Sequence, residues 1–262
     1  MKRFLPILFF SIVLRAEEAP PFPAGFQENR FIDTAHFRLY HESTFAPIGM
    51  TGRLEGLYAR LSLDLGDLAS WTQTQRIKVF VYADAGSYVG KTGIPAWSAA
   101  FANPQLREIH CYDSQHLERI LAHEMSHLFL TPYFMEKNAM PPVWLNEGVA
   151  KMMEWQYGQG DETGYLNKTV FADGMASPLH QMMAFDYHHG ASTSQALSLW
   201  YQQSASVTAY LMHRFPKTRF VAFCSELRDG KSTDQALQEA YGFQVPDVTA
   251  LERLWRSSLS EK

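Results

Sequence analysis

The sequence predicts an α+β fold, with a small mixed sheet in its first half and helices alone in its second half. Two segments of the first half, AHFRLYH at 35–41 and RIKVFVY at 76–82, are rich in aromatic and β-branched residues, which is typical of strands. From residue 147 onward, apolar residues recur at three- and four-residue steps, which is typical of helices. The pentad HEMSH at 123–127 lies where the two halves meet.

Length and composition bound the class of protein. The 262 residues fit one large domain, or two small domains that share a cleft. With 46% hydrophobic and 19% charged residues, the chain can bury a core and does not have the composition of a disordered protein. The formal net charge is -4 and there is no basic block, which argues against nucleic acid as a partner.

The N-terminus has the pattern of a signal peptide. Lys2 and Arg3 precede an apolar run at 4–14 that is too short to cross a bilayer as a helix, and LRA at 14–16 forms a cleavage site. We therefore expect a signal peptide at 1–16 and an exported protein, periplasmic or secreted, with no stable membrane span after cleavage. An uncleaved N-terminal anchor is the alternative.

Periodicity and turn residues predict the remaining elements. In the first half these are a helix at 52–68, a short helix from Asp84 to Val89, and a strand, a turn and a strand at 97–101, 103–105 and 106–112. In the second half they are helices at 147–157, 196–214, 217–228, 232–241 and 247–259. Asp113 or Ser114 would cap the pentad helix, which we expect to end near Thr131-Pro132.

Two cysteines, Cys111 and Cys224, do not make a disulfide-rich scaffold. They could pair in an oxidising compartment, or they could be two buried free thiols. Neither belongs to a CxxC of the kind that binds metals.

The pentad can direct two histidines at one metal ion. Residues four apart on an α-helix lie on the same face, so the imidazoles of His123 and His127 can share a ligand. Glu124 is one step round the helix, where its carboxylate can hold a water molecule beside the metal. This is the geometry by which HExxH binds zinc and supplies a general base. The alternative is a buried helix with two hydrogen-bonded core histidines.

A catalytic zinc ion needs a third protein ligand and an open position. His116 is too far from His123, because seven residues span about 10 Å along the helix axis. Nineteen residues separate His127 from Glu147, which leaves room for a loop and for a second helix, capped by Asn146, to return beside the first. Glu147 is therefore the candidate third ligand, although an acid is also favoured at a helix N-terminus for electrostatic reasons alone.

The pentad and the segment WLNEGVAKMME at 144–154 together resemble the gluzincin zinc metallopeptidases, the clan that includes thermolysin and the zinc aminopeptidases. The smaller peptidase-MA-like domains of bacterial exported proteins are closer in size. The resemblance covers most of the mature chain. It implies a zincin, thermolysin-like domain over 17–262, with a sheet-containing half at 17–130 and a helical half at 131–262.

The resemblance also implies the roles of the site residues. One Zn²⁺ ion would be held by His123, His127 and Glu147, and Glu124 would be the general base in the hydrolysis of a peptide bond. Tyr201 matches a tyrosine that, in the zinc aminopeptidases, donates to the oxyanion of the tetrahedral intermediate. It also begins a core-forming helix, so a packing role is the alternative. Tyr210, His188 and His189 are further candidates for the same role.

One departure from the aminopeptidase pattern bears on specificity. The segment AAFAN at 99–103 occupies the strand before the pentad, where a GxMEN motif for the substrate amine would lie. An endopeptidase is therefore favoured over an aminopeptidase, with a peptide or protein substrate that pairs with an edge strand. The alternative function is a non-catalytic envelope domain that has a peptidase fold and binds a peptide or a partner protein.

Overall fold

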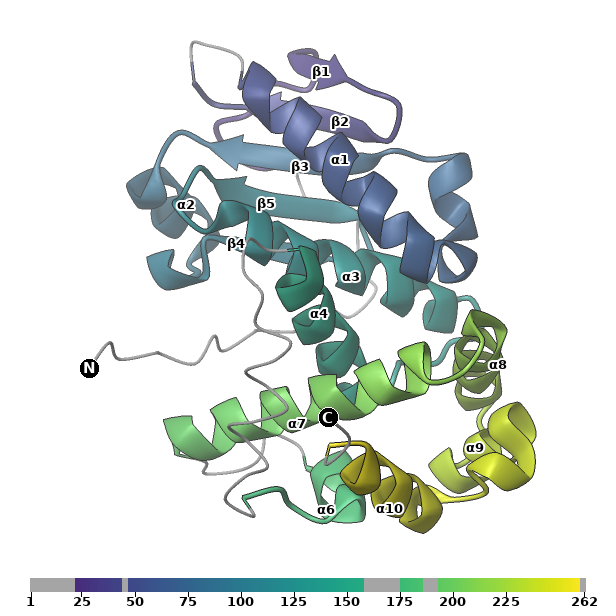
Figure 1. Ribbon diagram of the computed structural model, residues 1–262. Coiled ribbons are helices and arrows are strands. Elements are labelled where there is room, and N and C mark those ends of the chain that lie inside the picture. The colour runs from purple at the N-terminus through teal and green to yellow at the C-terminus, as the bar shows by residue number, and fades with distance from the viewer. Residues whose placement is uncertain (1–21, 44–46, 158–174, 186–192, 260–262) are drawn as a thin grey trace.

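The computed structural model describes residues 22–43, 47–157, 175–185 and 193–259. A sheet-containing half and a helical half lie one above the other, and the long helix α7 (Ser194–His213) crosses the helical half (Figure 1). This confirms the predicted α+β architecture, with the sheet first and the helices after it. The predicted signal peptide lies outside the described residues. Within those residues, no helix has the length and apolar character needed to cross a membrane.

The sheet is mixed, as predicted, and has five strands in the order β1-β2-β3-β5-β4. The strands are β1 (Phe31–Asp33), β2 (Phe37–His41), β3 (Ile77–Tyr82), β4 (Ala100–Asn103) and β5 (Glu108–Tyr112). β2, β3 and β5 run parallel, whereas β1 and β4 pair antiparallel at the two edges. β4 is the edge that faces the helical half (Figure 1), so it offers its free side to the site described below.

Each face of the sheet has its own core. On one face, Leu39, Val79 and Ile109 are fully buried, and they pack in one cluster with residues of α1 (Ile48–Leu65) and α3 (Leu117–Met135). On the other face, four rings form a stacked row across four strands, with neighbouring centroids 4.9, 4.8 and 4.6 Å apart. These rings belong to Tyr40, Phe80, His110 and Phe101.

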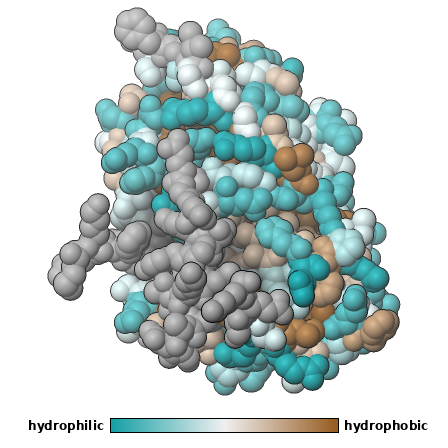
Figure 2. Space-filling model, in the orientation of Figure 1, coloured by the Kyte–Doolittle hydropathy of each residue, from teal (hydrophilic) through white to brown (hydrophobic). Residues whose placement is uncertain are grey.

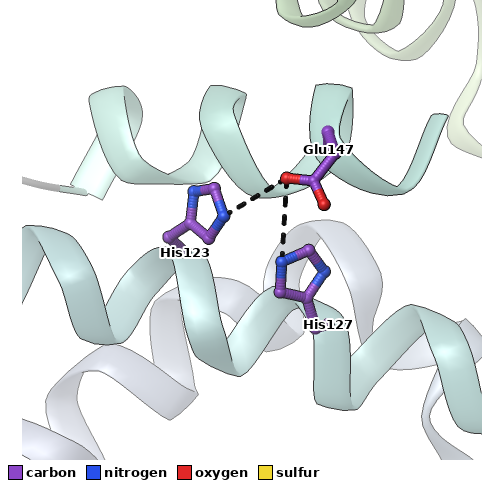
Figure 3. A group of neighbouring side chains, drawn as sticks. All are labelled: His123, His127 and Glu147. Atoms are coloured by element: carbon purple, nitrogen blue, oxygen red, sulfur yellow. Dashed lines mark ion pairs between the residues drawn. The ribbon is translucent and has the colours of Figure 1, made fainter. Parts of the chain in front are cut away.

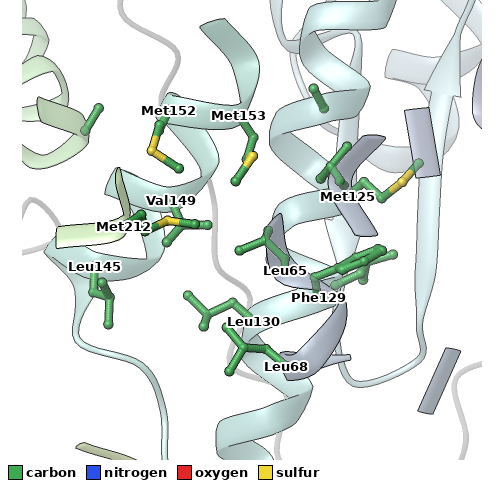
Figure 4. Close-up of a cluster of buried hydrophobic side chains, with 14 of the residues drawn as sticks. Leu65, Leu68, Met125, Phe129, Leu130, Leu145, Val149, Met152, Met153 and Met212 are labelled. Carbon is green, nitrogen blue, oxygen red and sulfur yellow. The ribbon is translucent and has the colours of Figure 1, made fainter. Parts of the chain in front are cut away.

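Helices make up most of the rest of the described chain. Besides α1, α3 and α7 they are α2 (Ala85–Thr92), α4 (Val143–Tyr157), α6 (Leu179–Ala184), α8 (Lys217–Arg228), α9 (Thr233–Tyr241) and α10 (Val248–Ser258). α4 packs against both α3 and α7. The buried side chains that join these helices include Leu65, Leu68, Met125, Phe129, Leu130, Leu145, Val149, Met152, Met153 and Met212 (Figure 4).

The predicted helices of the second half agree with the structure to within a few residues, apart from α4, which begins earlier. The helix predicted at 217–228 is α8 with the same bounds. Asp84 caps α2 as expected, because its carboxylate accepts from the backbone N–H of Ser87 at 2.8 Å. Neither β1 nor α6 is predicted, since three and six residues are too few to establish a period.

The predicted ends of the pentad helix are wrong. α3 begins at Leu117 without a side-chain cap, and Asp113 instead pairs with Arg53 of α1, with 3.2 Å between the charged atoms. The helix also continues past the predicted end at Thr131-Pro132, as far as Met135. The last turn is retained because it buries Phe134 completely.

The predicted start of the next helix is also wrong. α4 begins at Val143, four residues before the expected start, because the carbonyl of Pro142 accepts from the N–H groups of Leu145 and Asn146, both at 3.0 Å. Asn146 therefore lies inside the helix and does not cap it. Its side-chain oxygen accepts from the hydroxyl of Thr131 on α3, at 3.3 Å.

Three further bounds differ from the prediction. α1 begins at Ile48 instead of residue 52 and ends at Leu65, after which a 3-10 turn completes the predicted segment. The strand predicted at 97–101 begins only at Ala100, because Ala96–Ser98 forms a 3-10 turn and Ala99 has a φ of 54°. The strand predicted at 106–112 begins at Glu108.

The two cysteines do not pair. Cys111 on β5 and Cys224 on α8 are both free and fully buried. Burial raises the pKa of the Cys111 thiol to about 12, so it stays protonated and behaves as a small apolar core residue.

Candidate metal centre

Three side chains from two helices converge on one point (Figure 3). His123 and His127 lie one turn apart on α3, and Glu147 lies in the second turn of α4. Glu147 Oε2 is 3.6 Å from His123 Nε2 and 4.0 Å from His127 Nε2. One donor atom of each residue lies within 4.8 Å of the other two. The structure thus brings together the three side chains that the sequence singles out.

The donor set fits a zinc ion. Two imidazoles and one carboxylate are ligands that zinc takes in catalytic sites, and ligand distances of about 2.1 Å put the donors of a tetrahedral ion about 3.4 Å apart. The observed separations are close to this spacing, so small side-chain movements suffice. In the ranges that the structure describes, no other group of three or more histidine, cysteine or acidic residues places its donor atoms this close together.

For both histidines, burial lowers the pKa of the imidazole and nearby carboxylates raise it. Burial would lower the pKa of His123, but hydrogen bonds to Glu147 and Glu154 outweigh it and raise that pKa to about 9. For His127 burial prevails over the attraction of Glu147 and lowers the pKa. A lowered pKa favours the neutral imidazole, which is the form that binds a metal.

Glu124 lies between the candidate metal ligands and the edge of the sheet. Its Oε2 accepts from the backbone N–H of Ala102 on β4 at 2.8 Å. Its Oε1 is buried and has no hydrogen-bond partner among the residues described. Burial raises the pKa of Glu124 to about 8, so the carboxylate can take up and release a proton near neutral pH.

Glu154 is a site residue that the sequence reasoning misses. Its Oε2 lies 3.3 Å from His123 Nδ1, the ring nitrogen on the side away from Glu147. Lys151 Nζ lies 2.8 Å from each carboxylate oxygen, and Arg119 approaches Oε1 at 3.1 Å. Although burial opposes it, Lys151 and His123 lower the pKa of Glu154 to about 2. The sequence feature that could have indicated Glu154 is its position seven residues, or two helical turns, after Glu147, on the same face of α4.

Tyr201 lies on the side of α7 that packs against α4, the helix that carries Glu147. It is buried, and Ser204 and Thr208 follow it on the same face. A Cβ placed on Gly148 would lie 2.7 Å from the Ser204 carbonyl oxygen and 2.4 Å from Thr208 Oγ1, so the two helices are in close contact next to Glu147. The catalytic role of Tyr201 stays a prediction. Of the other candidates, Tyr210 lies further along α7, while His188 and His189 lie outside the described residues.

A separate cavity of about 320 Å³ lies between α4, α7 and α10. Its apolar lining includes Met152, Trp155 and Trp255, and none of the three converging ligands contributes to it. The face shown in Figure 2 is mostly hydrophilic and carries small hydrophobic patches over both halves. The candidate metal centre is therefore separate from this cavity.

Comparison with known families agrees with the site. A family model described as the Peptidase MA superfamily matches residues 65–261, which include all three candidate ligands. The chain belongs to the Peptidase MA superfamily. No curated protein matches it. This membership confirms the predicted family and indicates a metallopeptidase-like domain. The matched region runs from the end of α1 through the helical half.

Proposed function

We propose that this Peptidase MA domain is an exported zinc-dependent metallopeptidase that hydrolyses peptide bonds. The observation that carries the proposal is the buried arrangement of two histidines and one glutamate around a common point, with the carboxylate of Glu124 beside them. A histidine pair kept only for core packing would not need a converging carboxylate from a second helix. The family match supports the same reaction class.

Different residues of the chain would have different roles in the reaction. His123, His127 and Glu147 would hold one zinc ion, which acts as a Lewis acid and lowers the pKa of water from about 15.7 to about 7. Glu124 would accept a proton from the attacking water at Oε1 and return it to the leaving amine. Its bond from Ala102 fixes the direction of the carboxylate. Tyr201 would donate a hydrogen bond from its hydroxyl group to the developing oxyanion.

Strand β4 is the proposed binding edge for the substrate. It is the outer strand of the sheet, and the N–H of Ala102 is directed to Glu124, which places this residue at a position that does not bond to β5. An extended peptide that pairs with this edge would bring a backbone amide next to Glu124. Such pairing needs no free N-terminus, which supports an endopeptidase. Export rests on the signal-peptide pattern of residues 1–16.

The test is hydrolysis of a mixed peptide library by the zinc-loaded mature protein and by its Glu124→Gln variant. The variant removes the general base and keeps the ligands, so we expect zinc to remain bound and kcat to fall by about 10²–10⁴. Mass spectrometry of the products would also distinguish internal cleavage from removal of terminal residues. If wild type binds zinc and leaves every peptide intact, the alternative of a non-catalytic peptide- or partner-binding domain is favoured.

A further inference from the structure

Glu154 contacts two cationic side chains in addition to His123. Lys151 lies one turn before it on α4 and contacts both carboxylate oxygens at 2.8 Å. Arg119 reaches Oε1 from α3, one turn before His123, at 3.1 Å. The fourth member, His123 Nδ1, lies 3.3 Å from Oε2. The four side chains thus form a chain of polar contacts that links both ligand helices.

The position of Glu154 fixes the orientation of the His123 ring. An ionised carboxylate only accepts hydrogen bonds, so Nδ1 must carry the proton that it shares with Glu154. In the neutral ring the lone pair then lies on Nε2, the atom 3.6 Å from Glu147. Any movement of the Glu154 carboxylate would therefore be transmitted to the donor atom of the first ligand.

Lys151 is not an ordinary surface lysine. Its side chain is 20% exposed, and its ammonium nitrogen lies 5.4 Å from the centre of the Trp155 ring. In the other lysine ion pairs of the described ranges, the lysine side chains are between 35% and 45% exposed: these are Lys78, Lys91, Lys217 and Lys231. Because Glu124, Glu147 and Glu154 are all buried, a cation in this position also offsets their mutual repulsion.

We propose that Lys151 is a positioning residue for the metal centre and that it acts through Glu154, with Arg119 in support. Lys151 holds the carboxylate in place, the carboxylate orients His123, and His123 presents Nε2 to the metal. The inference rests on the proposed zinc site. It predicts that a residue outside the ligand set controls the affinity for zinc.

Zinc affinity measured by competition with a chromogenic chelator tests this proposal. Lys151→Met retains the length of the side chain and removes its charge, and we expect about tenfold weaker zinc binding, within the range found for residues that support metal ligands. Lys151→Arg retains the positive charge and should bind zinc with an affinity within about threefold of that of wild type. The absorption spectrum of the Co²⁺-substituted protein should change in Lys151→Met, because the geometry at His123 changes.

A double-mutant cycle and a matched control separate positioning from general loss of stability. Glu154→Gln should weaken zinc binding, and Lys151→Met should add little in that background, since both act on the same contact. Lys78→Met breaks a comparable pair, in which Lys78 lies 3.0 Å from the buried Glu108, and it should leave zinc affinity unchanged. Circular dichroism of each metal-free variant shows whether it is folded.

The outcomes distinguish this inference from the proposed function. If wild type binds no zinc, the proposed metal site itself fails. If wild type binds zinc and folded Lys151→Met binds it equally well, the inference is overturned. Additive losses in Lys151→Met and Glu154→Gln would also overturn it, because they would mean that Lys151 acts independently of Glu154.

Discussion

His123 is the residue at which the polar contacts of the site meet. Its Nε2 faces Glu147 and its Nδ1 faces Glu154, so both ring nitrogens are directed by carboxylates of α4. His127 has a different environment, since burial lowers its pKa and its Nε2 is 4.0 Å from Glu147. The two histidines of the pentad are therefore not equivalent, and a substitution at Glu154 should affect the metal through His123 alone.

Tyr201 provides a prediction at the scale of one residue. If its hydroxyl donates to the oxyanion, Tyr201→Phe should lower kcat by about 10²–10³ and leave KM and zinc affinity nearly unchanged. Steady-state kinetics on a peptide identified from the library would measure this. Tyr210→Phe is the matched control on the same helix and should retain wild-type kinetics. A wild-type kcat in Tyr201→Phe would assign Tyr201 to packing instead.

The sequence predicts the candidate ligands because two of them are close in sequence and the third lies in a recognisable helix. His123 and His127 are one helical turn apart, and Glu147 lies in a helix that periodicity alone identifies. Glu154 and the N–H of Ala102 are harder to predict, since each meets its partner only after packing brings two elements together. These supporting contacts around the candidate ligands depend on the tertiary structure and not on local sequence spacing.

At the scale of the element, the close packing of α4 and α7 depends on Gly148. A side chain there would overlap the Ser204 carbonyl oxygen, which is part of a helix backbone and cannot move aside. Gly148→Ala should therefore destabilise the protein by about 2 kcal/mol, although alanine favours a helix over glycine.

Chemical denaturation of Gly148→Ala and Gly56→Ala measures this effect. Gly56 lies within α1, and a Cβ added to it would have no atom within 4 Å, so alanine there should stabilise the protein by up to about 1 kcal/mol. Equal changes in the two variants would contradict the proposed role of Gly148 in helix packing.

Glu42 joins the end of β2 to α2 and gives a prediction about pH. Its carboxylate accepts from the N–H of Ala83 at 3.0 Å and from Ser87 and Lys91. Burial opposes ionisation, but these hydrogen bonds outweigh it and lower the pKa of Glu42 below its usual value of 4.5. A lowered pKa in the folded state contributes stability above pH 4.5, and that contribution is lost as the pH falls through the lowered pKa.

Glu42→Gln should therefore be less stable than wild type at pH 7, by about 1–2 kcal/mol, and the difference should shrink below pH 4.5. Urea unfolding at several pH values between 3 and 7 would measure it. Glu239→Gln, on an exposed side chain, serves as the control and should follow the wild-type curve. A constant difference between Glu42→Gln and wild type at all pH values would exclude this linkage.

Periodicity predicts the long elements better than their ends. α7 to α10 lie within two residues of their predicted bounds, because several turns of apolar spacing determine them. The ends of α3 and the start of α4 are wrong, because they depend on the burial of Phe134 and on the carbonyl of Pro142. Capping residues alone do not determine these ends, which depend on packing at the end of α3 and on backbone hydrogen bonds at the start of α4.

At the scale of the whole molecule, the site lies where the sheet half meets the helical half (Figure 1). β4 supplies the edge, α3 the two histidines and α4 the third candidate ligand, and α7 packs against α4. The change from strand to helix patterns predicts this division. The strand order does not follow from the pattern, since parallel pairing of β2, β3 and β5 is decided by long-range contacts.

Zinc K-edge X-ray absorption on the purified, zinc-loaded protein tests the central claim most directly. The account predicts one zinc ion per chain, with two imidazole nitrogens and oxygen ligands at about 2.0–2.2 Å, and loss of one imidazole in His127→Ala. Failure to retain zinc, or a first shell with sulfur at about 2.3 Å, would contradict the assignment of His123, His127 and Glu147 as the metal ligands.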